Sequence, residues 1–498
     1  MTIFSRTDLS SSDKPHLLAK TLTCQDHGDM TQLAQEYGLS RPTLYRARNE
    51  AEQALQSLLQ NDAPSICAVP ISEAQLKRAI VALGIESPNS IRSIQALIPI
   101  LYPTRRPSYG YIQGVLAEAQ RNAAVFNRQI DLSKIINAAL DEMFSQGDPV
   151  LAGVCLDSGY LFSLAHEHKR DALTWKQVLL QAAGQGMSLH NVVKDGAKGI
   201  AKGVSLVYPN AQQRDDVFHA LYITGKAVRR AEQRAYHSIR QEELAFQELQ
   251  PLCSSEHDSC YRTWSQQADR CDRAIARYEA AESSLSMLHS LFSSVCHVSG
   301  ELMTREMAQQ RLTQVIEGLR RAHHKECDKA ATYLENRVPG LTLATDALHQ
   351  RLSTLCERYP RECVELTCRM IEARRTFDKA SAKKQKRLSI EMLGCYRLLS
   401  QALSEPELEA ILVEVEQLTE KRHRASSAVE GFNATLRTYL YARKGVNQGF
   451  LELFQAWYNL HPRRWGRHQG KSAYEVLTGI KVDDWLTLLG FPPEQTLH

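Results

Sequence analysis

Apolar runs between residues 134 and 204 predict a small β-sheet with one helix. One run ends at Asp141, and two further β-type runs fold about a turn cluster at 157–159. A helical period follows, and a short apolar run at 189–193 then leads to Asp195. The predicted order is strand, strand, strand, helix, strand. An aspartate closes the first and the last of these strands.

Two helical patterns separated by a glycine occupy residues 31–48. Gly38 stands at the turn position of a helix-turn-helix motif, and Ser40 can cap the second helix. In such a motif the second helix lies in the major groove of DNA. Its candidate DNA contacts are Arg41, Thr43, Tyr45, Arg46 and Arg48. We predict a DNA-binding domain at 1–60; the alternative is a plain helical hairpin with a solvated basic face.

A second helical region covers residues 70–128, after a linker-like stretch. Arginines lie in the break before its last helix, which Ser108 can cap. The pattern predicts a second helix-turn-helix-like domain, with Arg105, Arg106 and Tyr109 as candidate DNA contacts. Two such modules would hold DNA over more than one turn of duplex. A helical spacer is the alternative.

Only helical periodicity appears from 226 to 420, where apolar residues recur every three to four positions. We predict an all-helical insertion there. Nine of the 12 cysteines lie in or beside it, but they lack the paired C-x2-C spacing of zinc sites. We interpret them as buried apolar residues.

The last segment, 421–498, begins with a helix that carries Glu430, Asn433 and Arg437 on one face. A stretch follows in which Lys444 and several arginines alternate with aromatic residues. Such a surface suits a phosphate backbone and splayed bases. Structural salt bridging is the alternative role for the helix face.

The length, net charge and composition of the chain change this picture only in part. With 498 residues the chain is too long for one core, so several domains are expected. The net charge is only +4, from 60 basic and 56 acidic residues, so any DNA-binding surface must be local. No apolar run approaches the length of a membrane span, and no secretory segment is evident. We expect a cytoplasmic protein, associated with the nucleoid when bound to DNA.

The two strand-ending aspartates are the strongest candidates for chemistry. If the first and last strands are neighbours in one sheet, Asp141 and Asp195 meet at its rim and can bind Mg²⁺, for which Mn²⁺ could substitute. Asp157 is a rival for the first acid, but it lies in a turn cluster. Glu142 and Asp148 are expected to face solvent.

These residues resemble the DDE transposases of the ribonuclease H-like fold, of the bacterial insertion-sequence and Mutator-like kind. The resemblance rests on Asp141 in LDEMF, Asp195 in VVKDGAKGI, Pro209, Ala211 and His219 in PNAQQRDDVFHAL, and Glu430 in SSAVEGFNATLRTYL. The family needs three carboxylates, and Glu430 supplies the third. The resemblance covers roughly 130–225 and 422–479.

The resemblance implies an α/β fold: a ribonuclease H-like mixed sheet core in two parts, 130–225 and 421–498, interrupted by the helical insertion. It implies a transposase whose Asp141, Asp195 and Glu430 hold Mg²⁺ while DNA strands are cut and transferred. His219 becomes a candidate contact of the scissile phosphate, and Asn433, Arg437 and Lys444 become candidate DNA contacts. The expected partners are double-stranded DNA (terminal inverted repeats and target) and further copies of the chain, in a homodimer or larger assembly on DNA.

Two other functions fit the same sequence. One is a domesticated transposase that only regulates or scaffolds DNA, although the presence of all three acids argues against it. The other is a structure-specific nuclease of the same fold, such as a junction resolvase. Two DNA-reading modules at the start of the chain favour recognition of specific ends instead.

Overall fold

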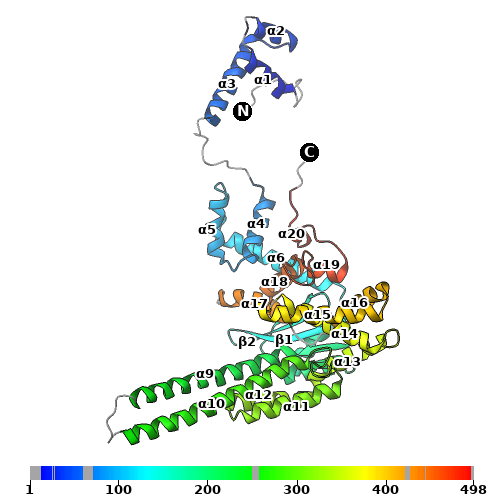
Figure 1. Ribbon diagram of the computed structural model, residues 1–498. Coiled ribbons are helices and arrows are strands. Elements are labelled where there is room, and N and C mark those ends of the chain that lie inside the picture. Colours follow the sequence, from blue (N-terminus) through cyan, green and yellow to red (C-terminus); the bar gives the residue numbers. More distant parts are fainter. Residues whose placement is uncertain are drawn as a thin grey trace. The chain divides into compact units, whose positions relative to one another are not determined.

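The computed structural model describes residues 13–24, 26, 28–59, 71–249, 257–378, 380–420, 427–442 and 445–494 (Figure 1). The chain divides into two compact units. One consists of 1–72 and 95–107, the other of 73–94 and 108–498. Among the described helices, none has the length and apolar character needed to cross a membrane.

The first unit contains three helices packed on a small apolar core: α1 (Asp13–Thr23), α2 (Asp29–Glu36) and α3 (Arg41–Leu59). Leu17, Leu33 and Leu44 are buried in that core. The chain turns between α2 and α3 at Gly38, whose φ of 60° is a left-handed conformation that glycine adopts without strain. The two helices and their turn lie where the sequence predicts them. Their DNA-binding role stays a prediction.

Helices α4 (Glu73–Ile85), α5 (Ile91–Leu101) and α6 (Tyr109–Gln129) precede the sheet. Helix α6 packs against α18 (Gln448–Leu460), where the Asn127 amide donates to the Glu452 carboxylate over 2.7 Å. Helices α4 and α6 belong to the same compact unit as the sheet, and the domain bounds 70–128 stay a prediction. A second helix-turn-helix-like DNA contact stays a prediction.

The second unit is built on a five-stranded mixed sheet of order β3-β2-β1-β4-β5. Its strands are β1 (Asn137–Ser145), β2 (Asp148–Cys155), β3 (Leu161–His166), β4 (Asn191–Lys194) and β5 (Gln212–Asp215). Strands β1, β2 and β3 pair antiparallel, whereas β4 is parallel to both β1 and β5. The first and fourth strands are therefore neighbours, as the proposed meeting of the two aspartates requires.

Two details of the sheet differ from expectation. Strand β1 does not end at Asp141 but continues to Ser145, because it forms a hairpin with β2 through a left-handed turn at 146–147. Strand β5 was not predicted, because its sequence QQRD is polar and carries no apolar run. As the last strand of the sheet, it needs little apolar surface.

Helices α7 (Ala172–Gly184) and α8 (Lys198–Val207) pack together, and Trp175 is fully buried beside Gly203, where a Cβ would lie 2.5 Å from the Trp175 Cβ. Helix α17 (Ser427–Ala442) contacts β1 and β2. Short helices α19 (Ala473–Thr478) and α20 (Trp485–Leu488) end the described chain.

Helix α18 closes the outer edge of β3 with polar side chains. The amide oxygen of Asn459 accepts from the Leu161 N–H over 2.8 Å, and that of Gln448 accepts from the His166 N–H over 2.9 Å. Gln455 donates to the Leu161 carbonyl over 3.1 Å. An open strand edge invites pairing with other chains, and these side chains satisfy it. The C-terminal segment thus completes the sheet.

The described residues between 217 and 420 form helices joined by turns and loops, with one isolated β-bridge between Val295 and Leu302. Helices α9 and α10 run side by side as a long hairpin (Figure 1). The helices are α9 (Val217–Leu249), α10 (His257–Leu291), α11 (Arg305–Arg321), α12 (Lys325–Glu335), α13 (Val338–Leu355), α14 (Arg361–Phe377), α15 (Ala382–Ala402) and α16 (Glu405–Glu420). They pack on two apolar cores. All ten described cysteines are free thiols, and most are buried.

Candidate catalytic site

Strand register brings the first two acids together. Leu140 of β1 pairs with Lys194 of β4 in parallel, so Asp141 and Asp195 follow at neighbouring positions. The Asp195 carboxylate accepts from the Ala197 N–H over 2.9 Å, which fixes the turn between β4 and α8. Because the two strands run parallel in this register, the two acids lie side by side although β1 continues past Asp141.

The third acid, Glu430, lies in the first turn of α17, the helix that packs on β1. The pKa of Asp141 is raised to about 6: burial raises it most, the nearby carboxylates of Asp195 and Glu430 raise it too, and two hydrogen bonds oppose the shift. Like charges disfavour ionisation only when they are close. The three acids thus share one electrostatic environment, although they are distant in sequence.

Two hydrogen bonds hold the Asp141 side chain. Its Oδ1 accepts from the Glu142 N–H over 2.8 Å, and its Oδ2 accepts from Nδ2 of Asn433 over 2.6 Å. Both bonds favour the ionised carboxylate. Asn433 was predicted to contact DNA, but it is 1% exposed and lies against the acid. Its Oδ1 is buried, with no hydrogen-bond partner among the described residues.

The acids fit a hard divalent cation by chemistry, since they offer carboxylate oxygens and uncompensated negative charge. In the described part of the chain, no group of three His, Cys, Asp or Glu side chains could hold a metal ion.

The adjacent Glu142 does not face solvent as predicted; its side chain is 3% exposed. It accepts from Nε1 of Trp175 over 3.0 Å and from Arg170 over 2.8 Å. Successive residues of a strand point to opposite faces, so Asp141 faces α17 whereas Glu142 faces α7. Asp148, the other acid expected at the surface, is 44% exposed.

Asp157 lies in the turn after β2 and accepts from the side-chain amide of Asn137 over 2.8 Å. Asn137 begins β1, four residues before Asp141. At about 3.3 Å per residue this places Asp157 about 13 Å from Asp141 along β1. The structure thus favours Asp141 over Asp157 as the partner of Asp195.

The helical segment contacts the loop of the second acid through Arg337, which precedes α13. Its guanidinium stacks on Tyr333 at 4.0 Å and lies 3.4 Å from the Gly196 carbonyl oxygen, to which it donates. A Cβ at Gly196 would overlap that guanidinium. The His219 ring packs 5.6 Å from the Tyr333 ring, so His219 belongs to this neighbourhood. Sequence reasoning missed Arg337, because it lies far along the chain and outside any motif.

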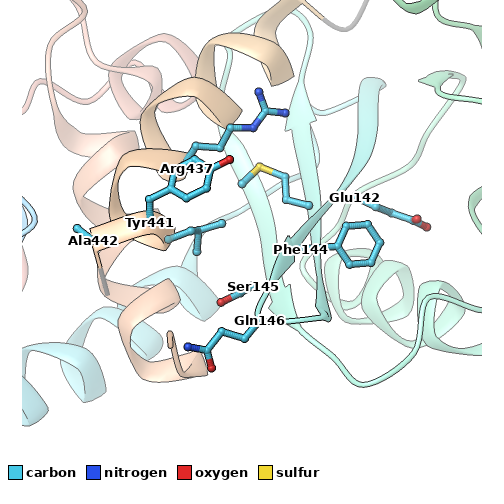
Figure 2. A pocket seen from close by; sticks show the side chains of 9 residues that line it. Glu142, Phe144, Ser145, Gln146, Arg437, Tyr441 and Ala442 are labelled. Atoms are coloured by element: carbon cyan, nitrogen blue, oxygen red, sulfur yellow. The ribbon is translucent and has the colours of Figure 1, made fainter. Parts of the chain in front are cut away.

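A groove lies between the end of β1 and the end of α17, at residues that follow Asp141 and Glu430 along these elements (Figure 2). Its volume is about 590 Å³. It is lined by Glu142, Met143, Phe144, Ser145, Gln146, Arg437, Leu440, Tyr441 and Ala442. Arg437, a predicted DNA contact, is exposed on its wall.

The remaining predicted DNA contacts belong to other elements than the acids. On α3, Arg41, Tyr45 and Arg46 are exposed and Thr43 is half-buried, whereas Arg48 is held by Glu52 over 2.8 Å. Arg105 donates to the Ile71 carbonyl. Arg106 and Tyr109 are exposed, and Lys444 lies outside the described residues.

Residues 140–350 match the family model of the ISL3-type DDE transposases, described as "Transposase". This segment is a transposase domain of the ISL3 family. The resemblance drawn from sequence is thus confirmed here. The transposase domain includes Asp141 and Asp195 and extends through the helices into α13, but it ends before Glu430.

Two further comparisons complete the picture. No curated protein matches the chain. Among solved structures, the Drosophila P element transposase strand transfer complex is similar at 12% identity with a TM-score of 0.31. That match covers 82% of this chain and 97% of the other.

Proposed function

We propose that this protein is a DNA transposase that binds transposon ends and cuts and transfers DNA strands with Asp141, Asp195 and Glu430. The observation that carries the proposal is the electrostatic contact of both other acids with Asp141, at the edge of a transposase domain. We further infer that the mixed sheet is the ribonuclease H-like core of the DDE transposases. The parallel pairing of β1 with β4, each leading to an aspartate, supports that inference.

The three carboxylates would hold Mg²⁺, which in a two-metal site activates the attacking oxygen and stabilises the leaving one. The chain's own residues prepare that site. Asn433 and the Glu142 amide fix the Asp141 carboxylate. Three like charges repel one another and a phosphate, so cation binding would draw the acids together and admit DNA.

The first unit would supply recognition of the ends. Arg41, Tyr45 and Arg46 are exposed on α3, the second helix of the helix-turn-helix-like pair. Arginines of such a helix reach phosphates and guanine edges in the major groove. Double-stranded DNA is thus the proposed partner, and pairing of two ends would require two copies of the chain.

The test is a Mg²⁺-dependent cleavage assay on duplex carrying the element's ends. Asp141→Asn, Asp195→Asn and Glu430→Gln should each lower cleavage by about 10³-fold or more, with end binding nearly unchanged. Asp148→Asn, a half-exposed acid of the same sheet, serves as the matched control. Wild-type cleavage by any of the three variants would remove that residue from the site. Detection of strand joining, beyond cutting, separates a transposase from a structure-specific nuclease.

A further inference from the structure

The groove beside the acids has a defined direction. Met143 and Ser145 share the Asp141 face of β1, since strand residues alternate between faces. Arg437 and Tyr441 follow Glu430 on α17 by seven and eleven positions, which keeps them on the same side of the helix. The groove therefore begins at the residue after Asp141 and follows β1 from Glu142 to Gln146, about 13 Å or the length of a few nucleotides.

The walls of the groove combine a charged side chain, Arg437, with an exposed aromatic ring, Tyr441. Figure 2 shows Arg437 and Tyr441 on α17 across from β1, and Glu142 and Phe144 on the opposite side of the strand. The Tyr441 side chain is 87% exposed. The carboxylate of Glu142 is paired with Arg170 on the other face, so it does not oppose a phosphate in the groove.

We propose that this groove binds one unpaired DNA strand next to the scissile phosphate. Arg437 contacts a backbone phosphate, and Tyr441 stacks on a base. A volume of about 590 Å³ lies within the range of single-ligand pockets, so it admits one or two nucleotides but no duplex. Aromatic stacking beside a basic group is the usual means of holding single strands without reading sequence. The proposal rests on the proposed function, because it assumes that a phosphodiester reaches the acids.

The groove predicts a preference for opened DNA. An end whose flanking nucleotides are unpaired can enter the groove directly, whereas a paired end must first be melted, which costs about 1.4 kcal/mol per base-pair step. The protein should therefore bind and process ends with a few mismatched flanking pairs better than fully paired ones.

The test measures binding of a fluorescein-labelled dT8 oligonucleotide to the full chain by anisotropy, in Ca²⁺ and with excess unlabelled duplex to occupy duplex-binding surfaces. Tyr441→Ala should weaken dT8 binding about 10-fold, Tyr441→Phe should retain it, and Arg437→Ala should weaken it with a smaller salt dependence. Unchanged dT8 affinity in Tyr441→Ala and Arg437→Ala would overturn the proposal. Equal loss in Tyr441→Phe would also overturn it, because a ring that keeps its stacking face should suffice.

A parallel cleavage measurement separates this proposal from the proposed function. Asp141→Asn should abolish cleavage, whereas Tyr441→Ala should weaken dT8 binding. If Asp141→Asn cleaves normally while Tyr441→Ala loses dT8, the catalytic assignment fails and the groove stands. If Asp141→Asn is inactive while Tyr441→Ala binds dT8 normally, the groove fails and the catalytic assignment stands.

Discussion

The two faces of β1 carry neighbouring carboxylates with opposite surroundings. Towards α7, Glu142 is enclosed by the Trp175 N–H and the Arg170 guanidinium, so its charge is balanced and it serves packing. Towards α17, Asp141 receives two hydrogen bonds but also faces two further acids, so negative charge remains in excess. Adjacent acids in a sequence thus differ in role according to which helix covers their face, and the excess charge marks the catalytic candidate.

The largest expected effect is on DNA cleavage, which should depend on Asp141 and not on Glu142. Asp141→Asn should reduce DNA cleavage by about 10³-fold or more, because a neutral amide is a poor cation ligand. Glu142→Gln should keep cleavage within about tenfold of wild type in a folded preparation, since its side chain faces the other side of the sheet. Cleavage rates of both variants on one DNA end give the comparison. Equal losses would contradict the division between the faces.

Glu142 should matter more for the stability of the fold than for DNA cleavage. Glu142→Ala removes the acceptor of the Trp175 N–H and the partner of Arg170 and should lower the free energy of unfolding by about 1–3 kcal/mol. Urea unfolding followed by tryptophan fluorescence measures this change. Asp148→Ala, at the end of the same hairpin, should stay within about 0.5 kcal/mol of wild type. A Glu142→Ala protein as stable as Asp148→Ala would show that the enclosed carboxylate contributes nothing.

The raised pKa of Asp141 predicts a pH-dependent difference. Its pKa of about 6 in the folded chain exceeds the ordinary 3.8, so its ionisation opposes folding. That cost is absent below about pH 4, grows as pH rises to about 6 and is complete above it. Asp141→Asn should therefore be more stable than wild type by about 1–2 kcal/mol at pH 8 without divalent metal, and no more stable at pH 4. Thermal unfolding measures this difference in stability. The same difference at pH 4 and pH 8 would show that ionisation of Asp141 is not its cause.

Asn433 should tune the same acid. Its hydrogen bond lowers the pKa of Asp141, so Asn433→Ala should move the pH midpoint of cleavage upward and cost about 10-fold at pH 7. A pH–rate profile separates this role from simple structural support, which lowers the rate without moving the midpoint.

The smallest expected effect concerns a residue of the first unit, Arg46. Arg46→Ala should weaken binding to end duplex by a few-fold, because one exposed phosphate or base contact is lost. Cleavage per bound complex should not change, since Arg46 belongs to the other unit. Anisotropy titration at moderate salt measures it, and unchanged affinity would argue against the helix-turn-helix assignment.

The apolar pattern of the sequence was enough to predict the two acids that the sheet register brings together. Asp141 and Asp195 follow apolar runs, and parallel neighbours bring them together. Glu430 needed the resemblance, because no local rule joins residues separated by the helical segment. The enclosure of Glu142 was not readable, since it depends on Trp175 and Arg170 of another element. Arg337 was missed for the same reason: its contact with Gly196 spans 141 residues.

The polar closure of the β3 edge has a consequence during synthesis. The Gln448 side chain that accepts from the His166 amide emerges 282 residues later. At about 5–20 residues per second, a ribosome needs roughly 15–60 s to supply it. Throughout that interval the nascent sheet offers bare backbone groups to any other strand, including the same edge on a chain from a neighbouring ribosome. A polypeptide truncated before α18 should consequently aggregate rather than form a smaller folded core.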